Sequence, residues 1–96
     1  MPERKVVRSS RFEQEARDLL ADRWKAIVDG LEWTLRRSAE FGQRVRGTNL
    51  QVWPLYPGDG YVYIAYYLVS SSEIRLHTLL KREVPVAPQI FDLDDF

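Results

Sequence analysis

Two consecutive β-patterned runs, Gly60–Val69 and Glu73–Arg82, joined by the turn Ser70–Ser72, constrain the fold more than any other feature. Side chains on a strand point alternately to opposite faces of a sheet. One face of this predicted hairpin is mostly aliphatic and contains Val62, Ile64, Tyr66, Leu68, Ile74, Leu76, Thr78 and Leu80. The other face contains aromatic rings, a histidine and cations: Tyr61, Tyr63, Ala65, Tyr67, Arg75, His77, Leu79 and Lys81. We therefore expect helices to cover the first face and functional residues to lie on the second.

The chain before the hairpin is predicted to supply those helices. Lys5–Arg8 is a short β-type run, and Ser10 with Glu13 three residues later is typical of a capping box. Two apolar stripes at helical spacing follow, formed by Phe12, Ala16, Leu19 and Leu20 and then by Trp24, Ile27, Val28, Leu31 and Leu35. Asp22 is the expected N-cap of the second helix, which should end near residues 39–42.

This order of elements predicts one α+β domain over residues 1–84, with the topology β-α-α-β-β-β. The expected architecture is a two-helix hairpin packed on one face of a mostly antiparallel four-stranded sheet. Within the third strand region, 43–56, a turn or bulge interrupts at residues 47–49. Pro54 has no N–H to donate, so this stretch is either an edge strand or leaves the sheet there. Residues 57–60 are a strong turn signal before the hairpin. Residues 85–96 form a separate acidic-hydrophobic tail.

Composition limits the classes of function. Residues 1–82 contain all 14 Lys and Arg against 10 of the 14 Asp and Glu, a balance of +4, and residues 83–96 contain the other four acids, a balance of −4. The tail could shield a basic surface or simply aid solubility. The absence of cysteine excludes disulfides and thiolate metal sites. With no visible secretory signal and no apolar run of membrane-spanning length, we expect a cytoplasmic protein with no membrane partner, metal or cofactor.

Several pieces of the chain, in this order, resemble the RelE/ParE superfamily of toxins from bacterial type II toxin–antitoxin systems. They are Val6–Phe12, the helical pair, Tyr63–Tyr66 and Ile74–Arg82, which together span about residues 4–82. The resemblance implies a toxin held inactive in a hetero-oligomer with its cognate antitoxin. It further implies either ribosome-dependent mRNA cleavage without a metal, as in the RelE branch, or poisoning of DNA gyrase without nuclease activity, as in the ParE branch.

Metal-independent RNA cleavage needs a base for the 2′-hydroxyl, cations for the phosphate charge and an acid for the leaving oxygen. The resemblance places the closing basic pair of the family at Lys81 and Arg82. Histidine as a residue type can act as an acid or a base near neutral pH, so His77, the single histidine, or a tyrosine is the candidate for proton transfer. The candidate catalytic residues are His77, Lys81, Arg82 and Tyr63. The candidates for binding RNA or phosphate are Arg44, Arg46, Arg75 and Tyr61, and all of these could instead be ordinary surface or strand residues.

The first hypothesis is therefore a RelE-like toxin that inhibits translation by metal-independent cleavage of mRNA on the ribosome, and one departure from the family pattern keeps a second hypothesis open. Many RelE-like nucleases have an arginine at the position that Tyr63 occupies, and this chain has no arginine between Arg46 and Arg75. This departure favours a ParE-like gyrase poison, a non-catalytic toxin-like protein that only binds its antitoxin, or a family branch with rearranged site residues. An unrelated α+β interaction module is the third hypothesis.

Overall fold

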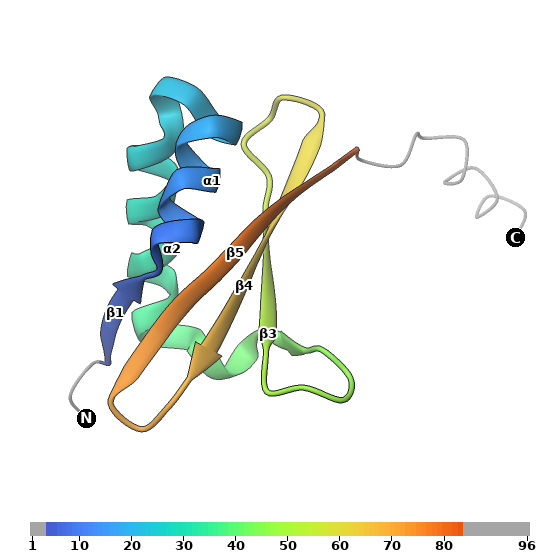
Figure 1. Ribbon diagram of the computed structural model, residues 1–96. Helices are drawn as coiled ribbons and strands as arrows, with labels where there is room; N and C mark the ends of the chain where they lie inside the picture. The colour runs from blue at the N-terminus through green and yellow to red at the C-terminus, as the bar shows by residue number, and fades with distance from the viewer. Residues whose placement is uncertain (1–3, 84–96) are drawn as a thin grey trace, which may run out of the picture.

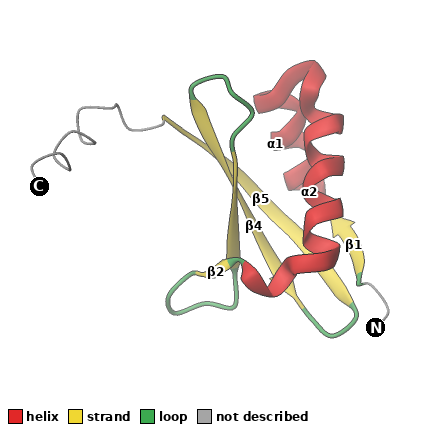
Figure 2. Ribbon diagram, turned by 180° about the vertical axis from the view of Figure 1, so that it is seen from behind, coloured by secondary structure: helices red, strands yellow, loops and turns green. Residues whose placement is uncertain are grey.

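The protein is described by a computed structural model that covers residues 4–83, except for the side chain of Phe41. Its elements, with the 3₁₀ turns labelled η, are β1 (Lys5–Arg8), α1 (Ser10–Leu20), η1 (Ala21–Arg23), α2 (Trp24–Ser38), η2 (Ala39–Phe41), β2 (Gln43–Arg44), β3 (Gln51–Leu55), β4 (Tyr61–Val69) and β5 (Glu73–Glu83). The strand order is β1-β5-β4-β3-β2. β1 is parallel to β5, and the other neighbouring strands are antiparallel. Both α-helices lie on the same side of this sheet (Figure 1, Figure 2).

The predicted β-α-α-β-β-β architecture, a two-helix hairpin on a four-stranded sheet, is therefore wrong, although the protein is α+β. The described part of the chain forms a five-stranded mixed sheet. The extra strand arises because the turn at 45–48 returns the chain on itself, so that Gln43 pairs with Val52 and Arg44 with Gln51. The helical residues also run from Ser10 to Phe41 without an intervening loop, and the chain changes direction within η1. The predicted tail, 85–96, lies outside the described residues.

The start of α1 is tied directly to β5. Ser9, not Ser10, is the N-cap, and its hydroxyl accepts a hydrogen bond from Phe12 N at 2.9 Å. The same hydroxyl donates to the carbonyl of His77 at 3.0 Å, and Ser9 N donates to Leu76 O. One serine therefore satisfies an orphan helix donor and also fixes where α1 meets the sheet. The predicted Asp22 cap is absent, because α2 follows η1 directly with no side-chain cap bond.

β5 contains a β-bulge at His77. Tyr66 pairs with Thr78 and Tyr67 pairs with Leu76, so the residue between has no partner of its own. A bulge shifts the alternation of side chains by one residue. Glu15 of α1 compensates for the disrupted ladder, since one carboxylate oxygen accepts bonds from Leu79 N at 3.0 Å and from the Thr78 hydroxyl at 2.6 Å.

The predicted orientation of the hairpin is wrong for β4. Tyr63, Ala65 and Tyr67 are buried in the core under the helices, whereas Val62 and Ile64 are only partly buried. The buried core residues are Phe12, Ala16, Leu20, Val28, Leu31, Leu35, Ala39, Tyr63, Ala65, Tyr67, Ile74, Leu76 and Leu79. Because of the bulge, β5 contributes Ile74 and Leu76 before it and Leu79 after it. The aliphatic residues of β4 therefore lie on the face away from the helices.

The buried tyrosines keep their hydroxyl groups paired. The Tyr67 hydroxyl donates to Ala39 O at 2.8 Å, and burial raises the pKa of Tyr67 to about 12. Gly42 lies against this ring: a Cβ at that position would be 2.8 Å from Tyr67 Cζ and 3.0 Å from Val52 O, and closer still to the hydroxyl. The turn that leads into β2 can therefore approach the core only with glycine at residue 42.

A partly buried ion network joins β1 to the helices. The guanidinium of Arg8 contacts the carboxylates of Glu32, Asp29 and Glu13, and it lies 5.7 Å from the ring centre of Trp24. The hydrogen bond to Glu32 is the main reason that the pKa of Arg8 is raised. Glu32 is nine-tenths buried, so removal of Arg8 alone would leave a carboxylate with poor hydration.

Ser9→Ala should lower the free energy of unfolding by about 2 kcal/mol, because the helix cap and the bond to His77 are lost together. Ser10→Ala is the matched control, since the Ser10 side chain is exposed, and it should change stability by less than about 0.5 kcal/mol. Urea denaturation measures both values. Equal effects of the two substitutions would contradict the assignment of the cap.

Gly42→Ala should destabilise the protein by about 1–3 kcal/mol, because the added methyl group overpacks a ring that has no room to move. Gly30→Ala is the opposite case: it adds a methyl group in α2 with nothing within 4 Å, and should stabilise by up to about 1 kcal/mol. Thermal and urea unfolding of the two variants test the close approach of residue 42 to Tyr67. A Gly42→Ala protein as stable as the parent would refute it.

Candidate functional site

Three of the predicted site residues meet at one end of the sheet. Lys81 pairs with Tyr63 across β4 and β5, and its ammonium lies 4.0 Å from the ring centre of Tyr61 and 6.0 Å from that of Tyr63. This is cation–π distance for both rings. Asp59 and Arg23 complete what we call the tyrosine–lysine cluster: Arg23, Asp59, Tyr61, Tyr63 and Lys81.

Asp59 links the turn before β4 to η1. Its carboxylate accepts bonds from the Tyr63 hydroxyl at 2.7 Å and from Tyr61 N at 3.1 Å, and it forms an ion pair with Arg23 at 3.1 Å. The Tyr63 bond is the chief reason that the pKa of Asp59 is lowered. Burial, followed by the bond to Asp59, raises the pKa of Tyr63. Tyr63 is therefore held as a neutral hydrogen-bond donor, which is the wrong state for a general base.

The other proposed catalytic residues lie away from the cluster. Arg82 is paired with Val62 and so lies on the opposite face of β5 from Lys81. His77 is exposed at the bulge, four residues from Lys81 and therefore about 13 Å along the strand. The structure thus joins Lys81 to Tyr63 but separates that pair from Arg82 and His77.

The predicted phosphate-binding arginines are also dispersed. Arg44 lies on β2 and pairs with Gln51, which in turn pairs with Tyr67 on β4. Tyr67 is four residues along β4 from Tyr63, so Arg44 lies well away from the tyrosine–lysine cluster. Arg46 follows it in the exposed turn. Arg75 forms an ion pair with Glu73 at 2.9 Å. Of the eight predicted site residues, only Tyr61, Tyr63 and Lys81 are brought together.

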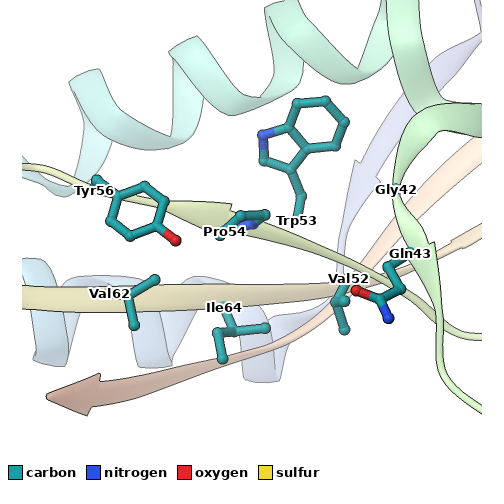
Figure 3. A pocket seen from close by; sticks show the side chains of 8 residues that line it. All are labelled: Gly42, Gln43, Val52, Trp53, Pro54, Tyr56, Val62 and Ile64. Atoms are coloured by element: carbon teal, nitrogen blue, oxygen red, sulfur yellow. The ribbon is translucent and has the colours of Figure 1, made fainter. Parts of the chain in front are cut away.

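The face of the sheet away from the helices contains a groove. It has a volume of about 550 Å³ and is lined by Gly42, Gln43, Val52, Trp53, Pro54, Tyr56, Val62 and Ile64. Figure 3 shows Val62 and Ile64 along β4, with Pro54 and Tyr56 beside them, whereas the indole of Trp53 points to the helix side. Tyr56 is 70% exposed.

The register extends this apolar surface across three strands. Leu80 lies beside Ile64 and Ile64 beside Pro54, while Tyr66 lies beside Val52. We call this surface the open face: Val52, Pro54, Tyr56, Val62, Ile64, Tyr66, Leu68 and Leu80. No described element covers it, and its apolar centre resembles a binding surface more than a catalytic site.

Sequence reasoning missed Asp59 and Arg23 of the tyrosine–lysine cluster, and it missed that the open face is uncovered by the described elements. The sequence indicates Asp59 only as part of the turn at 57–60, and no sequence pattern distinguishes Arg23. Strict alternation makes the open face the more aliphatic side of the hairpin, so the sequence predicts that this face lies under the helices. Among residues 4–83, no group of three or more acidic or histidine side chains is arranged to hold a metal ion.

Tyr63→Phe should raise the pKa of Asp59, because the strongest hydrogen bond to its carboxylate is lost. Since that pKa is lowered in the folded protein, the stabilisation from Asp59 is present above its ordinary value near 3.8 and is lost as the pH falls through the lowered value. Carboxyl NMR titration measures the shift. Tyr61→Phe is the control, since its backbone N–H bond to Asp59 remains, and an equal shift in both variants would contradict the assigned cause.

The described segments contain no helix with both the length and the apolar character needed to cross a membrane. Comparison with protein-family models finds no match. Comparison with curated proteins finds no significant relative.

Proposed function

We propose that this chain is a toxin-type protein of the RelE/ParE superfamily that acts in the cytoplasm by binding, with the open face as the surface that docks its antitoxin. The observation that supports this proposal best is the groove at Val52, Pro54, Val62 and Ile64, which is apolar and uncovered. Under this proposal, the enzyme that the toxin would inhibit by binding is DNA gyrase.

The separation of the candidate catalytic groups argues against chemistry on this chain alone. Cleavage requires an acid, a base and a cation around one phosphate, in hydrogen-bond reach of the reacting atoms. The hydroxyl of Tyr63 is bonded to Asp59 and Lys81 lies against Tyr61. Arg82 lies on the opposite face from Lys81. This arrangement does not group an acid, a base and a cation around one position for a phosphate.

The chemistry of the open face suggests what its partner presents. An apolar stripe of an amphipathic helix or strand would fill the groove, and acidic residues beside the stripe would meet the cations at its rim. Arg44, Arg46 and Arg82 have no hydrogen-bond or ion-pair partner among the described residues, and of these Arg82 lies on the open face beside Val62, whereas the register places Arg44 on the helix side. The partner is therefore expected to be an amphipathic, acidic segment of the antitoxin.

Ribosome-dependent mRNA cleavage is the second candidate function. The same three arginines are the observation that favours it, because guanidinium groups without protein partners are suited to phosphate contacts. The exposed His77 would then transfer a proton only when RNA and ribosome complete the site around it.

The docking proposal predicts that Ile64→Lys weakens antitoxin binding by thirtyfold or more, about 2 kcal/mol, because it places a charge at the centre of the groove. The antitoxin is taken as the product of the reading frame adjacent to this one, co-expressed and purified with it. Ala26→Lys, on the exposed side of α2, is the control and should bind as the parent does. Failure to obtain a complex, or unchanged affinity in Ile64→Lys, would refute the proposal.

The binding mode of action predicts no cleavage of mRNA on translating ribosomes, measured by primer extension with the purified protein. Intact transcripts together with stalled DNA replication after induction would support gyrase as the target. Cleavage that disappears in His77→Ala or Arg82→Ala would instead establish the ribonuclease.

A further inference from the structure

The open face begins beside the point where the described chain ends. Glu83, the last residue of β5, pairs with Tyr61, and the preceding Arg82 pairs with Val62 in the groove. The described part of β5 therefore ends one strand away from the groove, and 13 further residues, 84–96, follow in the sequence.

We propose that residues 84–96 bind back onto the open face and occupy the groove, so that an external partner must displace them. This inference rests on the proposed function, since it assigns a regulator to the same surface.

The length of the segment is sufficient. Neighbouring strands lie about 4.8 Å apart, so the far side of the groove at β3 is about 10 Å from β5. Phe91 is eight residues beyond Glu83 and can extend about 27 Å, and Phe96 can extend about 43 Å. Pro85 and Pro88 favour extended backbone, which suits a segment that crosses the strands.

The chemistry of the segment matches that of the groove. Its apolar residues near the end are Ile90, Phe91, Leu93 and Phe96, interleaved with Asp92, Asp94 and Asp95. The apolar side chains would cover Val52, Pro54, Val62 and Ile64 and remove that surface from water. The aspartates would meet Arg82, which lies beside Val62 on the open face, and Arg46 in the exposed turn after β2; neither arginine has a described partner.

Attachment in the same chain favours this occupant over a second copy. A segment tethered one strand away has an effective concentration in the millimolar range, far above the protein concentration of ordinary solution experiments. If the segment occupies the groove nine-tenths of the time, a partner that needs the open face binds about tenfold more weakly than it would to the empty face.

A spin label tests the contact directly, and the chain has no cysteine to interfere. Full-length protein with Asp95→Cys carries the label, and backbone amide NMR signals report its position. We expect broadening at Val62, Ile64 and Val52, none at Asp29 on the helix side, and loss of the broadening in the added triple variant Phe91→Ser, Leu93→Ser, Phe96→Ser. Gln89→Ser is the control and should retain the broadening.

Three results would overturn the proposal: no broadening on the open face, broadening that persists in the triple variant, or broadening seen only when labelled and unlabelled copies are mixed, which would identify a second copy. Measurement of antitoxin affinity then distinguishes the regulation by residues 84–96 from the proposed docking of the antitoxin on the open face. The triple variant should bind about tenfold more tightly than the parent, and unchanged affinity refutes the regulation. Broadening in a protein that forms no antitoxin complex refutes the proposed function alone.

Discussion

The hydrogen bonds from α1 and its N-cap to the bulged region of β5 fix where the first helix lies on the sheet. Glu15 accepts from Leu79 N and from the Thr78 hydroxyl, and Ser9 binds the carbonyl of His77. The desolvation that burial imposes on Glu15 raises its pKa, but these bonds outweigh it and the pKa is lowered overall. A bulge interrupts a ladder and leaves backbone groups unpaired, so the helix contributes the partners that the neighbouring strand does not.

This arrangement places aromatic rings under the helices and aliphatic residues outside. Tyr63 and Tyr67 can be buried because Asp59 and the carbonyl of Ala39 accept their hydroxyl protons. A buried hydroxyl without a partner would cost more than a net hydrogen bond contributes. The aliphatic residues Val62 and Ile64 need no such partner, and they remain on the open side where a binding partner can cover them.

The same arrangement separates the candidate catalytic groups Lys81 and Tyr63 from the open face, which is the candidate binding surface. Lys81 lies against two rings and the hydroxyl of Tyr63 is paired with a carboxylate, so both groups have structural roles at the end of the sheet. Arg82, which has no partner among the described residues, lies on the open face beside Val62. A surface with an apolar centre and a basic rim is suited to an amphipathic acidic segment, whether from an antitoxin or from residues 84–96 of the chain itself.

The sequence by itself determined the local elements: the two helical stripes, the hairpin of β4 and β5, and the turn at 57–60 all appear at the predicted places, because these depend on periodicity and turn chemistry over a few residues. Only the tertiary structure decided which face of β4 is buried, since both of its faces are apolar enough to form a core and the choice depends on distant partners such as Asp59 and Ala39. The bulge at His77 and the short strand β2 were likewise decided by contacts between residues far apart in the chain, which no local pattern specifies.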